Sequence, residues 1–202
     1  MSQYHHGNLR NALIVAAAEL IQERGSADFS MIDASRRAGV SSAAPYRHFK
    51  DKDALLEAVC QVAFMAMQEA TETAAAPLDI GTPEHIIALG NAYIKFVVDH
   101  PTFYDLMWGD YGIRAMETDA AELQSSGFYV LVESVQALCD IAGIKHCDTT
   151  ALATQLWATV HGLSGLTLNK HLEKFVPGLD VYSLLESTTH TFLAGLSADP
   201  AR

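Results

Sequence analysis

Residues 30–49 read SMIDASRRAGVSSAAPYRHF, and this stretch decides the fold of the N-terminal part of the chain. Ser30 followed three residues later by Asp33 is typical of a helix N-terminus, because each side chain can accept a hydrogen bond from the other residue's backbone N–H. Gly39 supplies the positive φ that a tight turn after this short helix requires. A second short helix is predicted over 41–49. Two short helices joined by a glycine turn are the geometry of a helix-turn-helix, in which the second helix enters the major groove of DNA.

Small side chains precede Tyr46 in the second helix of the pair, so its backbone can approach base edges closely. Tyr46 and His48 then offer polar groups for phosphate or base contact. Pro45 lies within the first turn, where a missing N–H costs least. The residues expected to contact DNA are Arg10, Ser30, Ser41, Ser42, Ala43, Ala44, Pro45, Tyr46, His48 and Lys52. A plain helical hairpin without a DNA contact is the alternative that the pattern leaves open.

Nearly all of the chain shows the apolar spacing of helices, and no strand-like alternation persists between turn residues, so the predicted fold class is all-α. A stripe from Leu9 to Ile21 predicts the first helix, and a long helix is expected from Asp51 to the break at Pro77. Further helices are predicted over 84–99, 101–109, 117–142, 148–171 and 180–196. We expect a three-helix helix-turn-helix domain over 1–55 and a helical ligand-binding and dimerisation bundle over 56–202.

Charge is divided unevenly along the chain. The net charge is −11, and residues 61–202 carry all of it, with six Lys and Arg against seventeen Asp and Glu. The balanced segment 1–60 is therefore the part of the chain that phosphates would repel least. Three cysteines without a disulfide framework fit a reducing cytoplasm, and no apolar run is long enough for a membrane span. We expect a cytoplasmic protein without cofactor or metal.

Three motifs within 9–59 resemble the N-terminal domain of the TetR (tetracycline-repressor) family: AAAELIQERG at 16–25, RAGVS at 37–41 and YRHFKDKDALL at 46–56. The resemblance implies a DNA-binding transcriptional regulator, and we expect a repressor that binds a palindromic operator and is released by a small molecule. The family often has a basic or threonine residue early in the recognition helix, where this chain has Ser42, Ala43 and Ala44. This departure implies fewer side-chain hydrogen bonds to bases and more reliance on backbone position and DNA shape.

The second half resembles the Trp–His–Gly (WHG) type of C-terminal domain in this family, through Trp157, His161 and Gly162 and the YHHG start at 4–7. Trp157 and His161 are four residues apart and therefore share one helix face. An aromatic run follows Pro101, and the resemblance places the corresponding short helix beside a ligand cavity. Aromatic walls suit a small apolar or aromatic effector. The expected ligand-binding residues are Phe103, Tyr104, Met107, Trp108, Trp157 and His161, and ordinary core packing of these side chains is the open alternative.

The last two long helices carry apolar stripes that predict a dimer interface. The stripes are Leu152, Leu156, Val160, Leu163 and Leu166 on one helix and Val181, Leu184, Leu185, Thr188 and Phe192 on the other. In the family, these positions pair two helices from each subunit into a four-helix bundle. A homodimer is also expected because one short recognition helix contacts few base pairs, and twofold symmetry doubles the readout.

Two other classes of protein fit the sequence less well. An enzyme is disfavoured because the chain contains no Gly-x-Ser-x-Gly motif, phosphate-binding glycine loop or metal-spaced cluster. A helical protein-binding scaffold without operator readout stays open as the alternative, and a duplex-binding assay separates it from a regulator.

Overall fold

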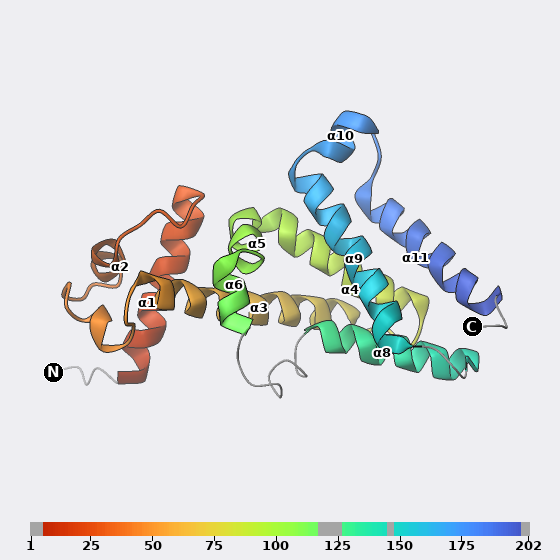
Figure 1. The fold of residues 1–202 in the computed structure, drawn as a ribbon, viewed down its shortest axis with the longest axis horizontal. Helices are drawn as coiled ribbons and strands as arrows, with labels where there is room; N and C mark the ends of the chain where they lie inside the picture. The colour runs from red at the N-terminus through yellow and green to blue at the C-terminus, as the bar shows by residue number, and fades with distance from the viewer. Residues whose placement is uncertain (1–5, 117–126, 145–147, 199–202) are drawn as a thin grey trace. The chain divides into compact units, whose positions relative to one another are not determined.

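The structure, a computed structural model, describes residues 6–116, 127–144 and 148–198 of the chain. Within these ranges all regular structure is helical, as the sequence predicts (Figure 1). The elements are α1 (His6–Arg24), α2 (Met31–Arg37), a 3-10 helix η1 (Pro45–Arg47), α3 (Lys52–Ala75), α4 (Pro83–Asp99), α5 (Pro101–Met107), α6 (Asp110–Met116), α8 (Gly127–Ala142), α9 (Thr149–Leu168), α10 (His171–Phe175) and α11 (Val181–Ala198).

The described chain divides into two compact units. The first, called the head here, contains the described residues up to Met65 together with 100–116. The second, called the body, contains 66–99 and the described residues from Gly127 onward. Helix α3 therefore contributes to both units, and the chain leaves the head and returns to it. The domain boundary expected at 55/56 stays a prediction.

The head is built around one apolar cluster. Leu13 and Ile21 on α1 are fully buried, and they share the cluster with Phe29, Phe49 and the first turns of α3. Helices α5 and α6 add Leu106 and Ala115 to the same cluster, although these two residues lie 54 and 63 positions after Lys52, where α3 begins. Each large aliphatic side chain buried in this way stabilises the fold by about 1.5–3 kcal/mol.

The body packs α4 against α8, α9 and α11. Its core cluster contains Ile86 of α4, Val135 and Leu138 of α8, Leu156 of α9 and Leu193 of α11. Each of these residues has less than a tenth of its surface exposed. Asp148 caps α9 by accepting a hydrogen bond from the Ala151 N–H at 3.0 Å. The predicted helical bundle in the second half of the chain is therefore confirmed for the described residues.

Several predicted helix boundaries differ from the observed ones. The helix predicted over 101–109 ends at Met107, because the chain turns at Trp108 and Gly109. Helix α6, over 110–116, was not predicted. The helix predicted over 148–171 ends at Leu168, and Lys170, with a φ of 56°, separates it from α10. The prediction over 117–142 is met by α8 over 127–142, while 117–126 lies outside the described residues.

Candidate DNA-binding interface

A capping box starts α2, as the sequence predicts. The Asp33 N–H donates to Ser30 Oγ at 3.1 Å, and the Ser30 N–H donates to Asp33 Oδ2 at 2.9 Å. The Ser30 hydroxyl also donates to Asp33 Oδ2, and these hydrogen bonds from Ser30 hold the pKa of Asp33 below its usual value. Gly39 follows with a φ of 70°, the left-handed conformation that the predicted turn requires. The Ser30 hydroxyl, a predicted DNA contact, is thus engaged in the helix cap.

The second half of the motif differs from the helix predicted over 41–49. The chain forms a turn at 42–44 and then the single 3-10 helix η1. Pro45 has no N–H, so it cannot donate to the carbonyl oxygen of Ser41, and that oxygen accepts from the Ala44 N–H at 3.0 Å instead. The carbonyl of Pro45 in turn accepts from the His48 and Phe49 N–H groups, both at 2.9 Å. The recognition element is therefore a tight turn rather than a regular α-helix.

This turn presents a small exposed tip. Ser41, Ser42 and Ala43 are exposed, and Tyr46 has 58% of its surface accessible. Ala44 and His48 are half-buried. Beneath the tip, Pro45 is fully buried and Phe49 is 4% exposed. Pro45 thus supports the tip from inside the head, and its ring offers no surface to DNA.

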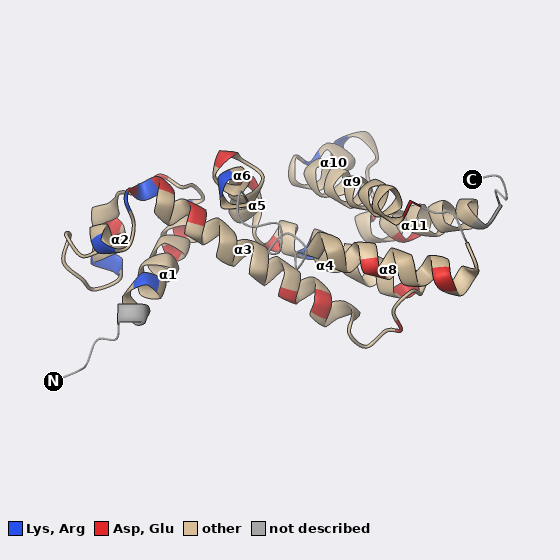
Figure 2. Ribbon diagram, turned by 60° about the horizontal axis from the view of Figure 1, so that its bottom comes forward, with Lys and Arg blue, Asp and Glu red and all other residues tan. Residues whose placement is uncertain are grey.

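The basic side chains of the head fall into two groups, and the first group is paired with carboxylates. Arg24 and Arg36 lie 3.5 and 3.9 Å from Asp33 oxygens. Arg37 donates to Glu23 Oε1 at 2.7 Å and has a second carboxylate partner on α1. Figure 2 shows Lys and Arg gathered on α1, α2 and the start of α3.

The second group of head cations has no carboxylate within ion-pair distance in the described part of the chain. It consists of Arg10, Arg47, Lys50 and Lys52. Arg10 lies over the ring of Phe49 at 5.4 Å, and Lys52 lies over the ring of Phe29 at 4.9 Å. Arg47 belongs to η1 itself, and Lys50 follows it after Phe49. Cations that are not paired with carboxylates in the described part of the chain can bind DNA phosphates.

Arg47 and Lys50 are candidate contacts that sequence reasoning missed. Both are exposed and lie beside the tip, whereas Arg24, Arg36 and Arg37 have carboxylate partners. Their charge and their position in the motif were available signals. They differ from Arg24, Arg36 and Arg37 in having no carboxylate partner among the described residues, and only the folded structure shows this difference.

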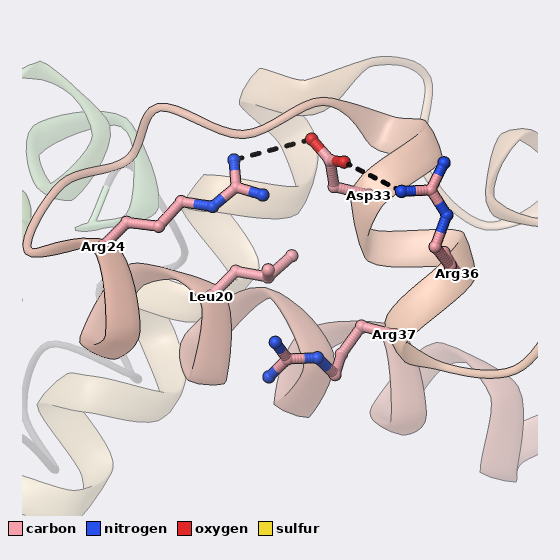
Figure 3. A pocket seen from close by; sticks show the side chains of 5 residues that line it. All are labelled: Leu20, Arg24, Asp33, Arg36 and Arg37. Atoms are coloured by element: carbon pink, nitrogen blue, oxygen red, sulfur yellow. Dashed lines mark ion pairs between the residues drawn. The ribbon is translucent and has the colours of Figure 1, made fainter.

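A surface hollow of about 330 Å³ lies between α1 and α2 (Figure 3). Its lining residues are Leu20, Arg24, Asp33, Arg36 and Arg37. Figure 3 shows the ion pairs from Asp33 to Arg24 and to Arg36. Because four of the five lining side chains are charged, this hollow lacks the chemistry of a site for an apolar effector.

The predicted ligand residues on α5 belong to the head. Met107 is fully buried, Phe103 packs against the head core, and the Trp108 ring meets Phe64 edge-on with the ring centroids 5.6 Å apart. Burial raises the pKa of Tyr104. These are the contacts of core side chains, and a role in ligand binding stays a prediction for this group.

Trp157 and His161 belong to the body and share one face of α9, as predicted, with ring centroids 5.6 Å apart. A hydrogen bond of 3.0 Å joins the Tyr93 hydroxyl of α4 to His161 Nδ1. Phe128 of α8 meets Trp157 edge-on at 6.0 Å. Burial lowers the pKa of His161, which favours the neutral form of its imidazole. Tyr93 and Phe128 extend this aromatic cluster, and no sequence motif marks them.

The apolar stripes predicted as a dimer interface largely face the protomer's own core. Leu156, Val160, Leu163 and Leu185 are between 3% and 9% exposed. Their large side chains fill the space between α9, α11, α4 and α8, so they are not free to meet a second subunit. The stripe position that remains well exposed is Leu166, at 41%. The remaining stripe positions, Leu152, Val181, Leu184, Thr188 and Phe192, are half-buried, and a dimer interface through these helices stays a prediction.

Both parts of the chain match known families in sequence. Residues 13–59 match the family described as bacterial regulatory proteins of the tetR family. Residues 86–192 match the tetracyclin repressor-like C-terminal domain, and this range includes Trp157, His161 and Gly162. No curated protein matches the chain in sequence.

Solved structures share this fold over nearly the whole chain. A protein of unknown function from Rhodococcus sp. RHA1 is 28% identical with a TM-score of 0.79, over 98% of this chain and 100% of that one. A TetR/AcrR family regulator from Thermobifida fusca is 20% identical with a TM-score of 0.61, over 92% of this chain and 97% of that one. A TetR family regulator from Marinobacter aquaeolei VT8 is 17% identical with a TM-score of 0.64, over 92% of this chain and 93% of that one.

None of the described helices combines the length and the apolar character needed to cross a membrane. The capped α2, the glycine turn and the short 3-10 helix η1 form a helix-turn-helix, and the family matches cover both this motif and the helical bundle. The chain belongs to the TetR family, and it is a DNA-binding transcriptional regulator and not an enzyme.

Proposed function

We propose that the protein is a repressor that binds a palindromic operator as a homodimer and that a small apolar or aromatic molecule releases it. The observation that carries the proposal is the exposed tip at Ser41, Ser42, Ala43 and Tyr46, together with the four head cations that have no carboxylate partner among the described residues. In the complex, the tip enters the major groove and the four cations meet phosphates. Tyr46 supplies a hydroxyl and an aromatic face at the edge of the tip.

A second copy of the chain fits the outward faces of α9 and α11. Helix α9 contains no Asp, Glu, Lys or Arg over Thr149–Leu168, and its exposed positions include Ala158 and Gly162. On α11, Ala194 and Gly195 are exposed in the same way. A Cβ built on Gly162 or Gly195 meets nothing within 4 Å, so a partner helix has room to approach. An exposed helix face of small, uncharged residues supports close packing between two copies.

Dimerisation gives the binding mode its symmetry. A twofold interface uses the same surface on both subunits, and it places two tips on two half-sites that are related by the same axis. The half-sites then lie about one helical turn of DNA apart or a multiple of it.

For the effector, the body offers the aromatic cluster of Tyr93, Phe128, Trp157 and His161. Three helices contribute to it, so a ligand that contacts the cluster can alter how α4, α8 and α9 pack. A ligand changes operator affinity only if it binds one arrangement of the two heads better than another. The cluster's aromatic faces and its imidazole, whose neutral form burial favours, suit an uncharged apolar or aromatic molecule.

The decisive experiment is selection of bound duplexes from a random double-stranded DNA library with the purified full-length protein. We expect an enriched sequence with two inverted half-sites. On that operator, Tyr46→Ala should weaken binding by about 1–3 kcal/mol while leaving the circular dichroism spectrum unchanged. If no duplex is enriched, the proposed function is wrong and a helical protein-binding scaffold becomes the better description.

A further inference from the structure

Helix α6 carries an arginine that reaches the first turns of α3. Arg114 Nε donates to Glu57 Oε1 at 2.6 Å, and its Nη2 lies 3.6 Å from Asp53 Oδ2. The guanidinium also lies over the ring of Tyr111 at 5.0 Å, and the Tyr111 hydroxyl donates to Asp53 Oδ1 at 3.4 Å. One cation therefore serves two carboxylates that are four residues apart on one helix face.

The position of this arginine is fixed by the packing of α6 within the head. Gly112 of α6 lies against the end of α5, where a Cβ would come within 1.7 Å of the Met107 carbonyl oxygen. Ala115, next to Arg114, is buried in the head core. Helix α5 is held to α3 in turn, because the Cys60 thiol donates to the Leu106 carbonyl at 3.6 Å. The close approach of α6 to α5 and α3 keeps Arg114 over the carboxylates.

Arg114 changes the balance of charge at the N-terminal end of α3, next to the lysines expected to bind phosphates. Lys50 and Lys52 are the cations there, and Asp51, Asp53 and Glu57 are the carboxylates, so carboxylates outnumber lysines by one. Arg114 brings the two signs into balance. Without it, the turn that carries Lys52 would have a net negative charge and would repel the DNA backbone.

We infer that Arg114 is an electrostatic shield for DNA binding: it pairs with Asp53 and Glu57 and offsets one of their two negative charges, so that these carboxylates cancel less of the attraction of Lys50 and Lys52 for phosphates. Arg114 acts through the carboxylates and need not touch DNA. The inference rests on the proposed operator binding at 41–52. Its long-range part weakens with salt, because the three side chains are between 31% and 59% exposed.

The test uses the operator obtained by selection and measures affinity by fluorescence anisotropy with the full-length protein. Arg114→Gln should weaken binding about tenfold at 50 mM salt and by less than about threefold at 300 mM salt, since screening removes the repulsion. Arg114→Lys keeps the charge and should stay near wild type. The matched control is Lys95→Gln, which breaks an exposed ion pair with Asp99 in the body and should leave affinity unchanged.

Variants of the two carboxylates distinguish an electrostatic role of Arg114 from a purely structural one. The double variant Asp53→Asn with Glu57→Gln should bind more tightly than wild type, because Arg114 is then unopposed. Adding Arg114→Gln to that pair should lower the affinity again but leave it above wild type, because the local charge is then +1, against +2 in the double variant and 0 in the wild type. The inference is wrong if Arg114→Gln binds like wild type, or if neutralising the carboxylates weakens binding as much as removing the arginine does.

Two further outcomes remain distinguishable. If the wild-type chain selects no duplex, operator binding itself fails, whatever the variants do. If Arg114→Gln loses its helical circular dichroism signal, Arg114→Lys and the carboxylate double variant still decide the question, because neither removes the cation from α6.

Discussion

Neutralising one of the unpaired cations near the tip should change how strongly salt weakens operator binding. Each head holds four such cations, so a dimer presents eight to the phosphates. If each releases one counterion, the slope of log K against log salt concentration is about −7 for the wild-type dimer. Lys50→Gln removes one contact from each head and should reduce the slope by about two units.

The assay is a titration of a labelled operator duplex at several salt concentrations between about 50 and 300 mM, the range over which counterion release dominates affinity. Lys174→Gln, at an exposed lysine of α10 in the body, is the control and should leave the slope unchanged. A wild-type slope shallower than about −3, or equal slopes for wild type and Lys50→Gln, would refute the assignment of these cations to phosphates.

Three other predictions follow from packing and burial. Burial lowers the pKa of His85 and His161 in the folded state, so the unfolded chain binds more protons below about pH 6.5; urea unfolding should show a smaller free energy of unfolding at pH 5.5 than at pH 7.5, and a pH-independent value would contradict this. Gly112→Ala forces α6 away from the Met107 carbonyl and should lower the free energy of unfolding by about 1–3 kcal/mol. An unchanged urea midpoint would show that α6 has room to accept a Cβ at this position. Leu163→Glu places a charge in the protomer core and should unfold the chain, while Ala158→Glu on the exposed face should give a folded monomer in the ultracentrifuge; a dimeric Ala158→Glu variant would place the interface elsewhere.

Local signals in the sequence predicted the first half of the DNA-binding motif well. The Ser30–Asp33 capping box and the positive φ at Gly39 depend on residues within a few positions of each other, and both are observed. The 3-10 form of η1 was missed although its cause, the missing N–H of Pro45, is also local. The sequence predicts Pro45 in the first turn of an α-helix, but the chain continues only as the short 3-10 helix η1.

Long-range packing explains most of what could not be predicted. The aliphatic stripes of α9 and α11 have the same spacing whether they meet a partner subunit or the protomer's own α4 and α8. Periodicity therefore could not show whether Leu163 lies in the protomer core or in a dimer interface. The pairing of Arg114 with Glu57 joins residues that are 57 positions apart. In the same way, no pattern in the sequence distinguishes Arg37, which pairs with carboxylates, from Arg47, which has no carboxylate partner among the described residues.

The division of labour within the recognition turn has a consequence for how operator preference can change. Pro45 and Phe49 hold the turn in place from beneath, whereas Ser41, Ser42 and Ala43 are exposed. Exposed positions of this kind tolerate substitution within about 0.5 kcal/mol of stability. New side chains at these three positions can therefore change which DNA sequence the protein prefers without disturbing its fold. Both evolution and protein engineering can use these positions to alter operator preference.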